Sequence, residues 1–337
     1  MTKIKNKLDL AIGNPQFLQP YWGEFGSEAI SIIRPNFSMD YLKNGSIPGL
    51  IHQINQLHIN INNTEMYFYD TVIGCGATQL IFASMYALSK MHGYTAVYVP
   101  KPYWFRFPEM IRRCGLKFVT RPSAKVITIL TSPNNPTGFP YLSNDWSPKT
   151  IFDVCYNWPQ YLIDRDGRSH SFTIKQDIMI FSLAKATGHA GTRIGWALVR
   201  DTQIARYMED YIEYTTGGVS VEAQHKCLSL LNHQNNLFRL GANHYTCFGV
   251  GKSILQSRWN DLYNAWKTNK YTILNKYGMF VWCRGANNCN AATFERATQT
   301  SVISGKICGS DNRYFRINIG CSEKNFEEFI NRVNKIK

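Results

Sequence analysis

Short runs of apolar residues alternate along this chain with turns rich in glycine, proline and asparagine and with segments of helical periodicity. Residues 69–80 (YDTVIGCGATQL) predict a strand, a glycine-rich turn and then a helix that opens at about Ala77 or Thr78. A second helix is expected near 109–115. Further buried strands are expected at 96–100, at the start of 128–138 (TILTSPNNPTG) and in an apolar run that ends on Asp153.

Two later helices are bounded by clear signals. Residues 201–216 predict a capped helix that Gly217-Gly218 stops, and 322–337 predict an amphipathic helix. Its inward face is expected to hold Phe326, Phe329, Ile330, Val333 and Ile336. Alternating strands and helices predict an α/β fold with a mostly parallel sheet covered by helices. We expect a large domain at 46–250 and a smaller α+β domain built from 1–45 and 251–337.

Composition narrows the class of protein. The chain has 337 residues, of which 44% are hydrophobic, and it has no apolar run long enough to cross a membrane. The first eight residues are charged and no apolar segment of a signal peptide follows them, so we expect a cytoplasmic protein. The nine cysteines are scattered without C-x-x-C spacing, which predicts free thiols and no metal site.

The net charge of +14 raises the question of nucleic-acid binding. The basic residues are nevertheless spread out, with no run longer than two, so no basic stripe is visible. An electropositive funnel for small anions fits the charge equally well. We therefore expect neither nucleic acid nor a membrane as a partner.

The segment 177–196 (DIMIFSLAKATGHAGTRIGW) carries the most specific chemical signal. Lys185 lies in an apolar run, where a lysine loses water easily, has a lowered pKa and becomes a nucleophile. Ser182 precedes it by three residues, and Arg193 follows by eight with the planar charge that phosphate favours. Two other segments carry groups suited to the same phosphate-bearing ligand. One holds Asp153, with Tyr156 three residues later, and the other is the turn before the helix at Ala77.

These motifs, in this order, resemble the alliinase/tryptophan aminotransferase-like branch of fold-type I enzymes, which use pyridoxal 5'-phosphate (PLP). The resemblance covers nearly the whole chain. It includes the opening segment at 10–15 with Tyr21-Trp22, the YNWPQY signature at 156–161, and the segment 187–199. The resemblance implies a large domain and a small one in the aspartate aminotransferase-like arrangement.

The resemblance also implies a role for each residue of the cofactor site. Lys185 would carry PLP as a Schiff base, Asp153 would pair with the pyridine nitrogen, and Tyr156 and Asn135 would bond the ring hydroxyl. Trp104 would stack on the ring, although Tyr103 or Phe105 in the same aromatic run could do so instead. The phosphate would be held by Gly76, Ala77, Thr78, Ser182 and Arg193, and by Tyr41 of a neighbouring subunit, which implies a homodimer.

Substrate contacts follow in the same way. Arg316 would clamp the α-carboxylate, with Gly13 and Asn135 close to it, and Arg313 is a competing candidate. Ala77 departs from the family, which commonly has a hydroxyl residue there, so a modest loss of cofactor affinity is expected. His189 is expected to order the loop after Lys185 and to have no chemical role.

The expected activity is transfer of an amino group from an aromatic L-amino acid, tryptophan first, to a 2-oxo acid such as pyruvate. Lys185 would act as general base and then as general acid. A carbon–sulfur lyase acting on cysteine derivatives shares the early steps and is the alternative. A binding protein with this fold and without catalysis is disfavoured, because Lys185, Asp153, Tyr156, Arg193 and Arg316 are all present.

Overall fold

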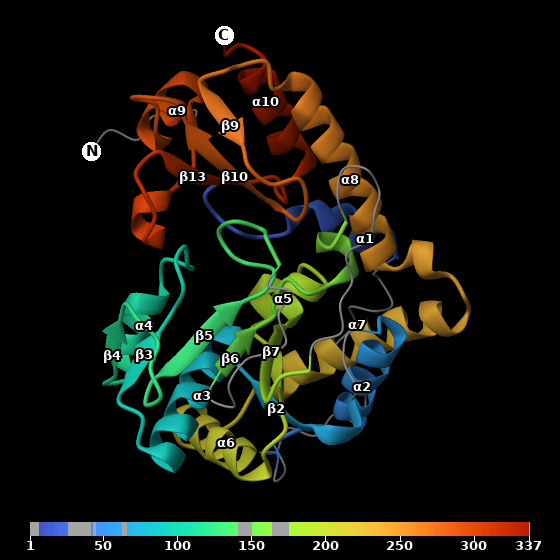
Figure 1. Cartoon of the computed structure of the whole chain (residues 1–337). Helices are drawn as coiled ribbons and strands as arrows, with labels where there is room; N and C mark the ends of the chain where they lie inside the picture. The colour runs from blue at the N-terminus through green and yellow to red at the C-terminus, as the bar shows by residue number, and fades with distance from the viewer. Residues whose placement is uncertain are drawn as a thin grey trace.

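The computed structural model of the chain describes residues 7–25, 42, 45–62, 66–140, 150–163 and 175–336. Within these ranges the chain forms two main sheets of different size with helices packed around them (Figure 1). The larger sheet lies in the lower half of the view and the smaller one lies near the C-terminus at the top. The predicted phosphate ligand Tyr41 falls outside the described residues.

Seven strands form the larger sheet. Its strand β8 runs antiparallel to both neighbours, and the other neighbouring pairs are parallel, as predicted for most of the sheet. The central strands are buried along their whole length, which is typical of a sheet covered by helices on both faces. In spatial order the strands are β2 (Asp70–Gly74), β8 (Gly195–Val199), β7 (Ile178–Ser182), β6 (Thr150–Asp153), β5 (Ile127–Thr131), β3 (Ala96–Tyr98) and β4 (Lys117–Val119).

The helices begin and end close to the predicted residues. Asp201 caps α6, since its carboxylate accepts hydrogen bonds from the backbone of Gln203 and Ile204, and Gly217 ends that helix in the left-handed conformation. The C-terminal helix is shorter than predicted and ends at Val333. The helices are α1 (Gln19–Phe25), α2 (Leu50–Asn60), α3 (Ala77–His92), α4 (Phe107–Arg113), α5 (Leu183–Ala186), α6 (Thr202–Thr216), α7 (Val221–Arg239), α8 (Cys247–Ala265), α9 (Ala291–Thr298) and α10 (Glu323–Val333).

The smaller sheet is antiparallel and has four strands. Its strand order is β12 (Ile303–Ser304), β13 (Tyr314–Asn318), β10 (Phe280–Gly285) and β9 (Tyr271–Ile273). A separate two-stranded sheet joins the N-terminal segment to the C-terminal part of the chain, because β1 (Leu8–Asp9) pairs in parallel with β11 (Thr300–Ser301). Helix α8 runs through the expected domain boundary at 250/251, and the division into two domains stays a prediction.

An aromatic cluster fills the core where α2 meets the large sheet. The Trp196 indole N–H donates to Nε2 of the fully buried His58 over 2.8 Å. Phe181 stacks on Trp196, and Trp158 packs against both rings. Large apolar side chains therefore lock β7 to β8, the two strands on either side of the Lys185 and Arg193 segment.

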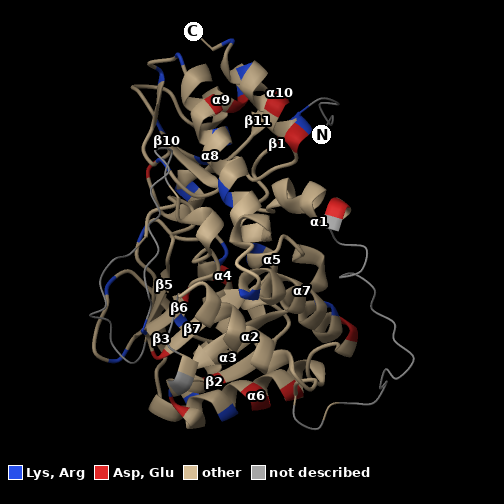
Figure 2. Cartoon of the chain, turned by 90° about the vertical axis from the view of Figure 1, so that its right-hand side faces the viewer, with Lys and Arg blue, Asp and Glu red and all other residues tan. Residues whose placement is uncertain are grey.

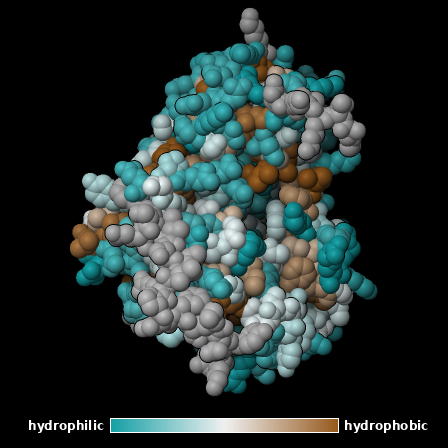
Figure 3. Space-filling view, turned by 180° about the vertical axis from the view of Figure 1, so that it is seen from behind, coloured by the Kyte–Doolittle hydropathy of each residue, from teal (hydrophilic) through white to brown (hydrophobic). Residues whose placement is uncertain are grey.

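The part of the surface that is coloured in Figure 3 is mainly hydrophilic. Seen from behind, hydrophobic residues form small patches, and several gather beside a hollow in the middle of this face (Figure 3). Lys and Arg residues are distributed over many elements and alternate with acidic ones (Figure 2).

Candidate active site

The predicted site residues come together in one cavity of about 470 Å³. It lies at the carboxyl ends of β6 and β7, where parallel sheets usually bind ligands, and the β12–β13 side of the smaller sheet closes it. Gly76 lies next to the lining, in front of α3. The predicted residues that line the cavity are Gly13, Ala77, Thr78, Trp104, Asn135, Asp153, Tyr156, Ser182, Lys185, Arg193 and Arg316.

Lys185 extends into this cavity from the short helix α5, directly after strand β7. Its Nζ donates a hydrogen bond of 2.6 Å to the Gly13 carbonyl, and its own carbonyl accepts bonds from Tyr161 Oη (2.9 Å) and Gln160 Nε2 (3.2 Å). Burial lowers the pKa of Lys185 from 10.5 to about 8, and the positive charges of Arg316 and Arg193 act in the same direction. The amine is thus held in place and is available as a nucleophile and base near neutral pH.

Asp153 ends strand β6 and is buried at the floor of the cavity. Burial raises the pKa of its carboxyl, while hydrogen bonds from Cys155 and from the Thr131 hydroxyl oppose that shift. Tyr156 is buried beside it, and burial raises the pKa of its phenol far above neutral pH, so the phenol keeps its proton. The carboxylate can accept an N–H bond from a cationic ring, and the phenol can donate to an oxygen.

A positively charged cup lies at the N-terminus of α3. Gly76 has a φ of +81°, and a Cβ atom there would lie 2.8 Å from the Nη2 atom of Arg193. The backbone of Arg193 itself has the left-handed conformation, with a φ of +54°. Its guanidinium donates hydrogen bonds to the carbonyls of Ala190 (3.1 Å) and Cys75 (3.4 Å). A guanidinium beside the first backbone N–H groups of a 16-residue helix is a combination that binds phosphate. Ala77 contributes no hydroxyl, as the sequence indicated.

Arg316 is almost completely buried on strand β13, with 3% of its surface exposed. It donates to Asn135 Oδ1 over 2.6 Å and to the Ala11 carbonyl, and its guanidinium lies 4.2 Å from the centre of the Phe280 ring. No carboxylate among the described residues pairs with it, its Nε lacks a hydrogen-bond partner, and burial lowers its pKa. A buried cation held only by neutral oxygens requires an anion, which predicts a carboxylate ligand here.

The structure decides between several alternatives that the sequence left open. Arg313 is exposed and interacts with Asp311, so it is not the cavity arginine. Tyr103 packs edge-on against Phe118 and does not line the cavity, whereas its neighbours Trp104 and Phe105 do. His189 bonds to the Thr187 hydroxyl outside the lining, and burial lowers its pKa to about 4.

The lining also contains residues to which the sequence analysis assigned no role. Cys155 lies between Asp153 and Tyr156, and burial keeps its thiol protonated by raising its pKa. Arg106 directly follows the aromatic residues Tyr103, Trp104 and Phe105. Its place beside this run was the only sequence feature that could have pointed to a position in the cavity. Ile303 had no local signal, because β12 reaches the cavity only through its pairing with β13.

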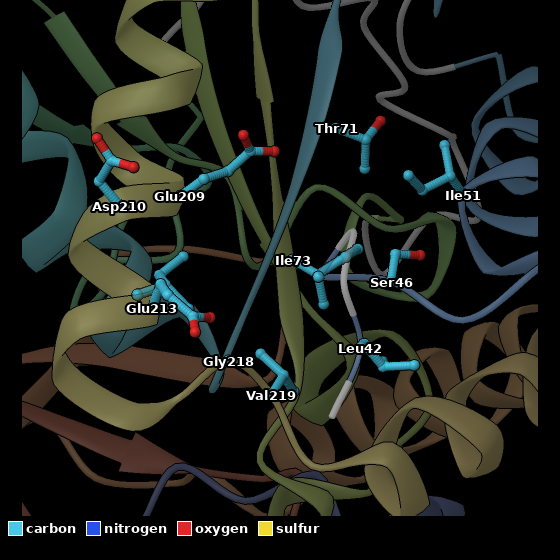
Figure 4. Close-up of a pocket in the computed structure, with 12 residues that line it drawn as sticks. Leu42, Ser46, Ile51, Thr71, Ile73, Glu209, Asp210, Glu213, Gly218 and Val219 are labelled. Atoms are coloured by element: carbon cyan, nitrogen blue, oxygen red, sulfur yellow. The ribbon is translucent and has the colours of Figure 1, made fainter. Parts of the chain in front are cut away.

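A second, larger cavity of about 670 Å³ shares no residue with this one. In Figure 4 the carboxylates of Glu209, Asp210 and Glu213 extend from α6 on one side, and the apolar Ile51 and Ile73 lie across from them. Burial together with Asp70 and Asp210 raises the pKa of Glu209. The described residues that line it include no lysine, histidine or cysteine, whereas the smaller cavity contains Lys185 and Cys155.

No three His, Cys, Asp or Glu side chains of the described chain are close enough to hold a metal ion. No helix that the structure describes has both the length and the apolar composition needed to cross a bilayer.

Comparison with known proteins agrees with this geometry. Residues 8–337 match the family model described as "Allinase". The chain belongs to the alliinase family. Within it, the chain is 29% identical to tryptophan aminotransferase-related protein 2 of Oryza sativa subsp. japonica, over 98% of this chain and 73% of that protein. It is 28% identical to alliin lyase 1 of Allium sativum, over 66% of this chain and 49% of that protein.

Solved structures show the fold of this alliinase-family chain. An aspartate aminotransferase variant of Thermus thermophilus, complexed with tryptophan, covers 99% of the chain with a TM-score of 0.75 and 17% identity, and 92% of that structure is matched. The Rhizobium meliloti aspartate aminotransferase gives a TM-score of 0.73 at 17% identity, over 98% of this chain and 91% of that one. The predicted aspartate aminotransferase-like fold type I is confirmed, and the protein is an aminotransferase-like enzyme. The family and the fold are PLP-dependent.

Proposed function

We propose that this protein binds PLP and transfers the amino group of an aromatic, tryptophan-like L-amino acid to a 2-oxo acid such as pyruvate. The observation that carries the proposal is the cavity itself. It places a lysine with a lowered pKa, a buried carboxylate and a buried arginine without an anion around one space of about 470 Å³. The names of the plant tryptophan aminotransferase-related proteins support the choice of donor.

The residues present fit PLP. Arg193, the N-terminus of α3 and Ser182 suit its phosphate, and Asp153 suits its ring nitrogen. Tyr156 and Asn135 suit its hydroxyl, and the aromatic wall of Trp104 suits a ring. When bound, PLP provides an electron sink for the charge left at the substrate Cα.

The protein's own residues supply positioning and proton transfer. Arg316, oriented by Asn135 and the Ala11 carbonyl, grips the substrate α-carboxylate and fixes the direction of the Cα–H bond. Lys185 Nζ accepts that proton, because burial keeps a useful fraction of the amine neutral near pH 8. Tyr161 and Gln160 hold the Lys185 backbone, so the amine starts from a defined position.

The test is a half-reaction. Purified protein loaded with PLP is mixed with L-tryptophan alone, and cofactor and product are identified by mass spectrometry. Pyridoxamine phosphate together with indole-3-pyruvate is expected, and the Lys185→Ala variant is expected to form neither. Full turnover by Lys185→Ala would overturn the proposal.

A carbon–sulfur lyase is the second candidate, supported by the similarity to Allium sativum alliin lyase 1. Both activities need the same early proton transfer by Lys185. The two are separated by incubation with a cysteine sulfoxide without an oxo acid. Ammonia and pyruvate would identify the lyase, whereas stoichiometric pyridoxamine phosphate would identify the transferase.

The homodimer and the cytoplasmic location stay predictions. Light scattering of the PLP-loaded protein checks the first, and a monomer with full activity would refute shared active sites. Cell fractionation checks the second.

A further inference from the structure

The active-site cavity is more basic than the proposed cofactor and α-carboxylate contacts require. Among the described residues, its lining contains four basic side chains, Arg106, Lys185, Arg193 and Arg316, and one acidic side chain, Asp153. Lys185 and Arg193 belong to the proposed PLP site, and Arg316 to the α-carboxylate. Arg106 is the remaining cation, and neither the cofactor nor a simple amino acid uses it.

Arg106 also has no anionic partner in the described part of the chain. Among the residues that the structure describes, no carboxylate forms an ion pair with it. Its guanidinium lies 5.8 Å from the centre of the Phe105 ring. The nearest acidic residue along α4, Glu109, is already bound by Arg112 and Arg113. The guanidinium is therefore available to an anionic group of a ligand.

The backbone that carries Arg106 is held at both ends of its loop. The Tyr103 N–H donates to the Cys308 carbonyl over 3.0 Å, and the Phe107 N–H donates to the Trp104 carbonyl over 3.0 Å. Asn134, close to the Arg316 partner Asn135, donates to the Pro102 carbonyl. Arg106 is thus an exposed cation at the cavity rim on an anchored loop, whereas Arg316 is a buried cation in the cavity wall.

We propose that Arg106 binds the distal carboxylate of a 2-oxo dicarboxylic acid, which is the amino acceptor of this enzyme. The inference rests on the proposed aminotransferase function and refines its acceptor. Arg316 takes the carboxylate next to the keto group, and Arg106 takes the second one. The acceptor leaves as the corresponding amino dicarboxylic acid. An aromatic donor instead lies against Trp104 and Phe105, since the exposed Arg106 side chain has space to turn toward solvent.

The test compares two acceptors that differ in one group. The pyridoxamine-phosphate form of the enzyme is mixed with 2-oxoglutarate or with 2-oxopentanoate, which has the same chain length and no distal carboxylate. The wild type is expected to favour 2-oxoglutarate about tenfold in kcat/KM, because solvent screening limits a rim contact. Arg106→Gln is expected to abolish this preference, because it lowers kcat/KM for 2-oxoglutarate more than for 2-oxopentanoate, while Arg106→Lys retains part of it.

Arg112→Gln is the matched control, since it removes a neighbouring arginine of α4 that does not line the cavity. Equal use of both acceptors by the wild type would overturn the inference. Loss of activity toward both by the same factor in Arg106→Gln would also overturn it, because that result means a structural role.

A binding measurement separates this inference from the proposed function. Calorimetric titration of the PLP-loaded protein compares glutarate with pentanoate, neither of which can react. Glutarate is expected to bind about tenfold more tightly, and only in proteins that keep Arg106. Failure to aminate any oxo acid would refute the proposed function alone, whereas equal affinity for glutarate and pentanoate would refute the role of Arg106 alone.

Discussion

The lowered pKa of Lys185 leads to a pH dependence that can be measured before any substrate is known. Attachment of PLP to the apoprotein requires the neutral amine. With a pKa of about 8, about a quarter of the Lys185 amines are neutral at pH 7.5, whereas an ordinary lysine at 10.5 would give about one in a thousand. Attachment is therefore expected to be about two hundred times faster than at an unperturbed lysine.

The sign of the effect follows from the direction of the pKa shift. The rate constant is expected to rise about fivefold between pH 7 and pH 8 and to level off above about pH 9, because the amine is then mostly neutral. Stopped-flow absorbance of PLP mixed with apoprotein between pH 7 and 10 records this profile. A rate that keeps rising through pH 9.5 would refute the argument that burial lowers this pKa.

Substitutions of neighbouring charged residues test which charges contribute to the lowered pKa of Lys185. Arg316→Gln removes a positive charge that lowers the Lys185 pKa, so the midpoint is expected to move to higher pH. Asp153→Asn removes a negative charge that raises it, so the midpoint is expected to move to lower pH. Arg112→Gln, on the exposed face of α4, is the control and leaves the midpoint in place. Identical midpoints in all four proteins would show that these charges do not act on Lys185.

Three further changes test other parts of the structure. Arg316→Lys keeps the charge but loses the planar two-point contact, so kcat/KM for the amino donor is expected to fall about a hundredfold in steady-state assays. An undiminished kcat/KM would argue against binding of the substrate α-carboxylate by Arg316. Gly76→Ala places a methyl group 2.8 Å from Arg193 Nη2 at a φ of +81°. PLP affinity, measured by equilibrium dialysis, is therefore expected to fall about tenfold or more. Gly93→Ala, at a helix C-cap with free space around it, is the control and should leave PLP affinity unchanged. Trp196→Phe removes the indole N–H that donates to buried His58, which should lower the free energy of unfolding in urea by about 1–3 kcal/mol. Trp266→Phe is the control, since the Trp266 N–H bonds a less buried carbonyl. If Trp196→Phe lowers the free energy of unfolding no more than Trp266→Phe does, the buried hydrogen bond to His58 does not have the assigned value.

Local patterns were sufficient for much of the fold. The apolar runs became the buried strands β5, β6 and β7, because a strand covered on both faces has no exposed side to carry polar residues. Helix α6 begins and ends where Asp201 and Gly217 predict, since capping depends on hydrogen bonds within a few residues. Helix α10 ends a few residues before the predicted position, because no glycine follows Val333 to mark a C-cap and helix ends without such a signal are poorly defined.

The candidate site likewise contains residues that the sequence predicted and residues whose role only the structure decided. Lys185, Asp153 and the turn at Gly76 could be found because each lies at the carboxyl end of a strand. The strands β2, β6 and β7 run in the same direction, so these ends lie at one edge of the sheet. The choice of Arg316 over Arg313 required the register of β13 against β10, which buries one arginine and exposes the other.

The sequence by itself determined the family, the fold class and the residues suited to PLP, because these depend on short motifs and on the order of strands and helices. Tertiary structure alone decided how residues from distant segments share one space. It joined the Gly13 carbonyl to Lys185, placed Ala11 and Asn135 on Arg316, and brought Arg106 and Ile303 into the same cavity. Such contacts arise from the packing of one sheet against another, and no local pattern along the chain specifies which surfaces will meet.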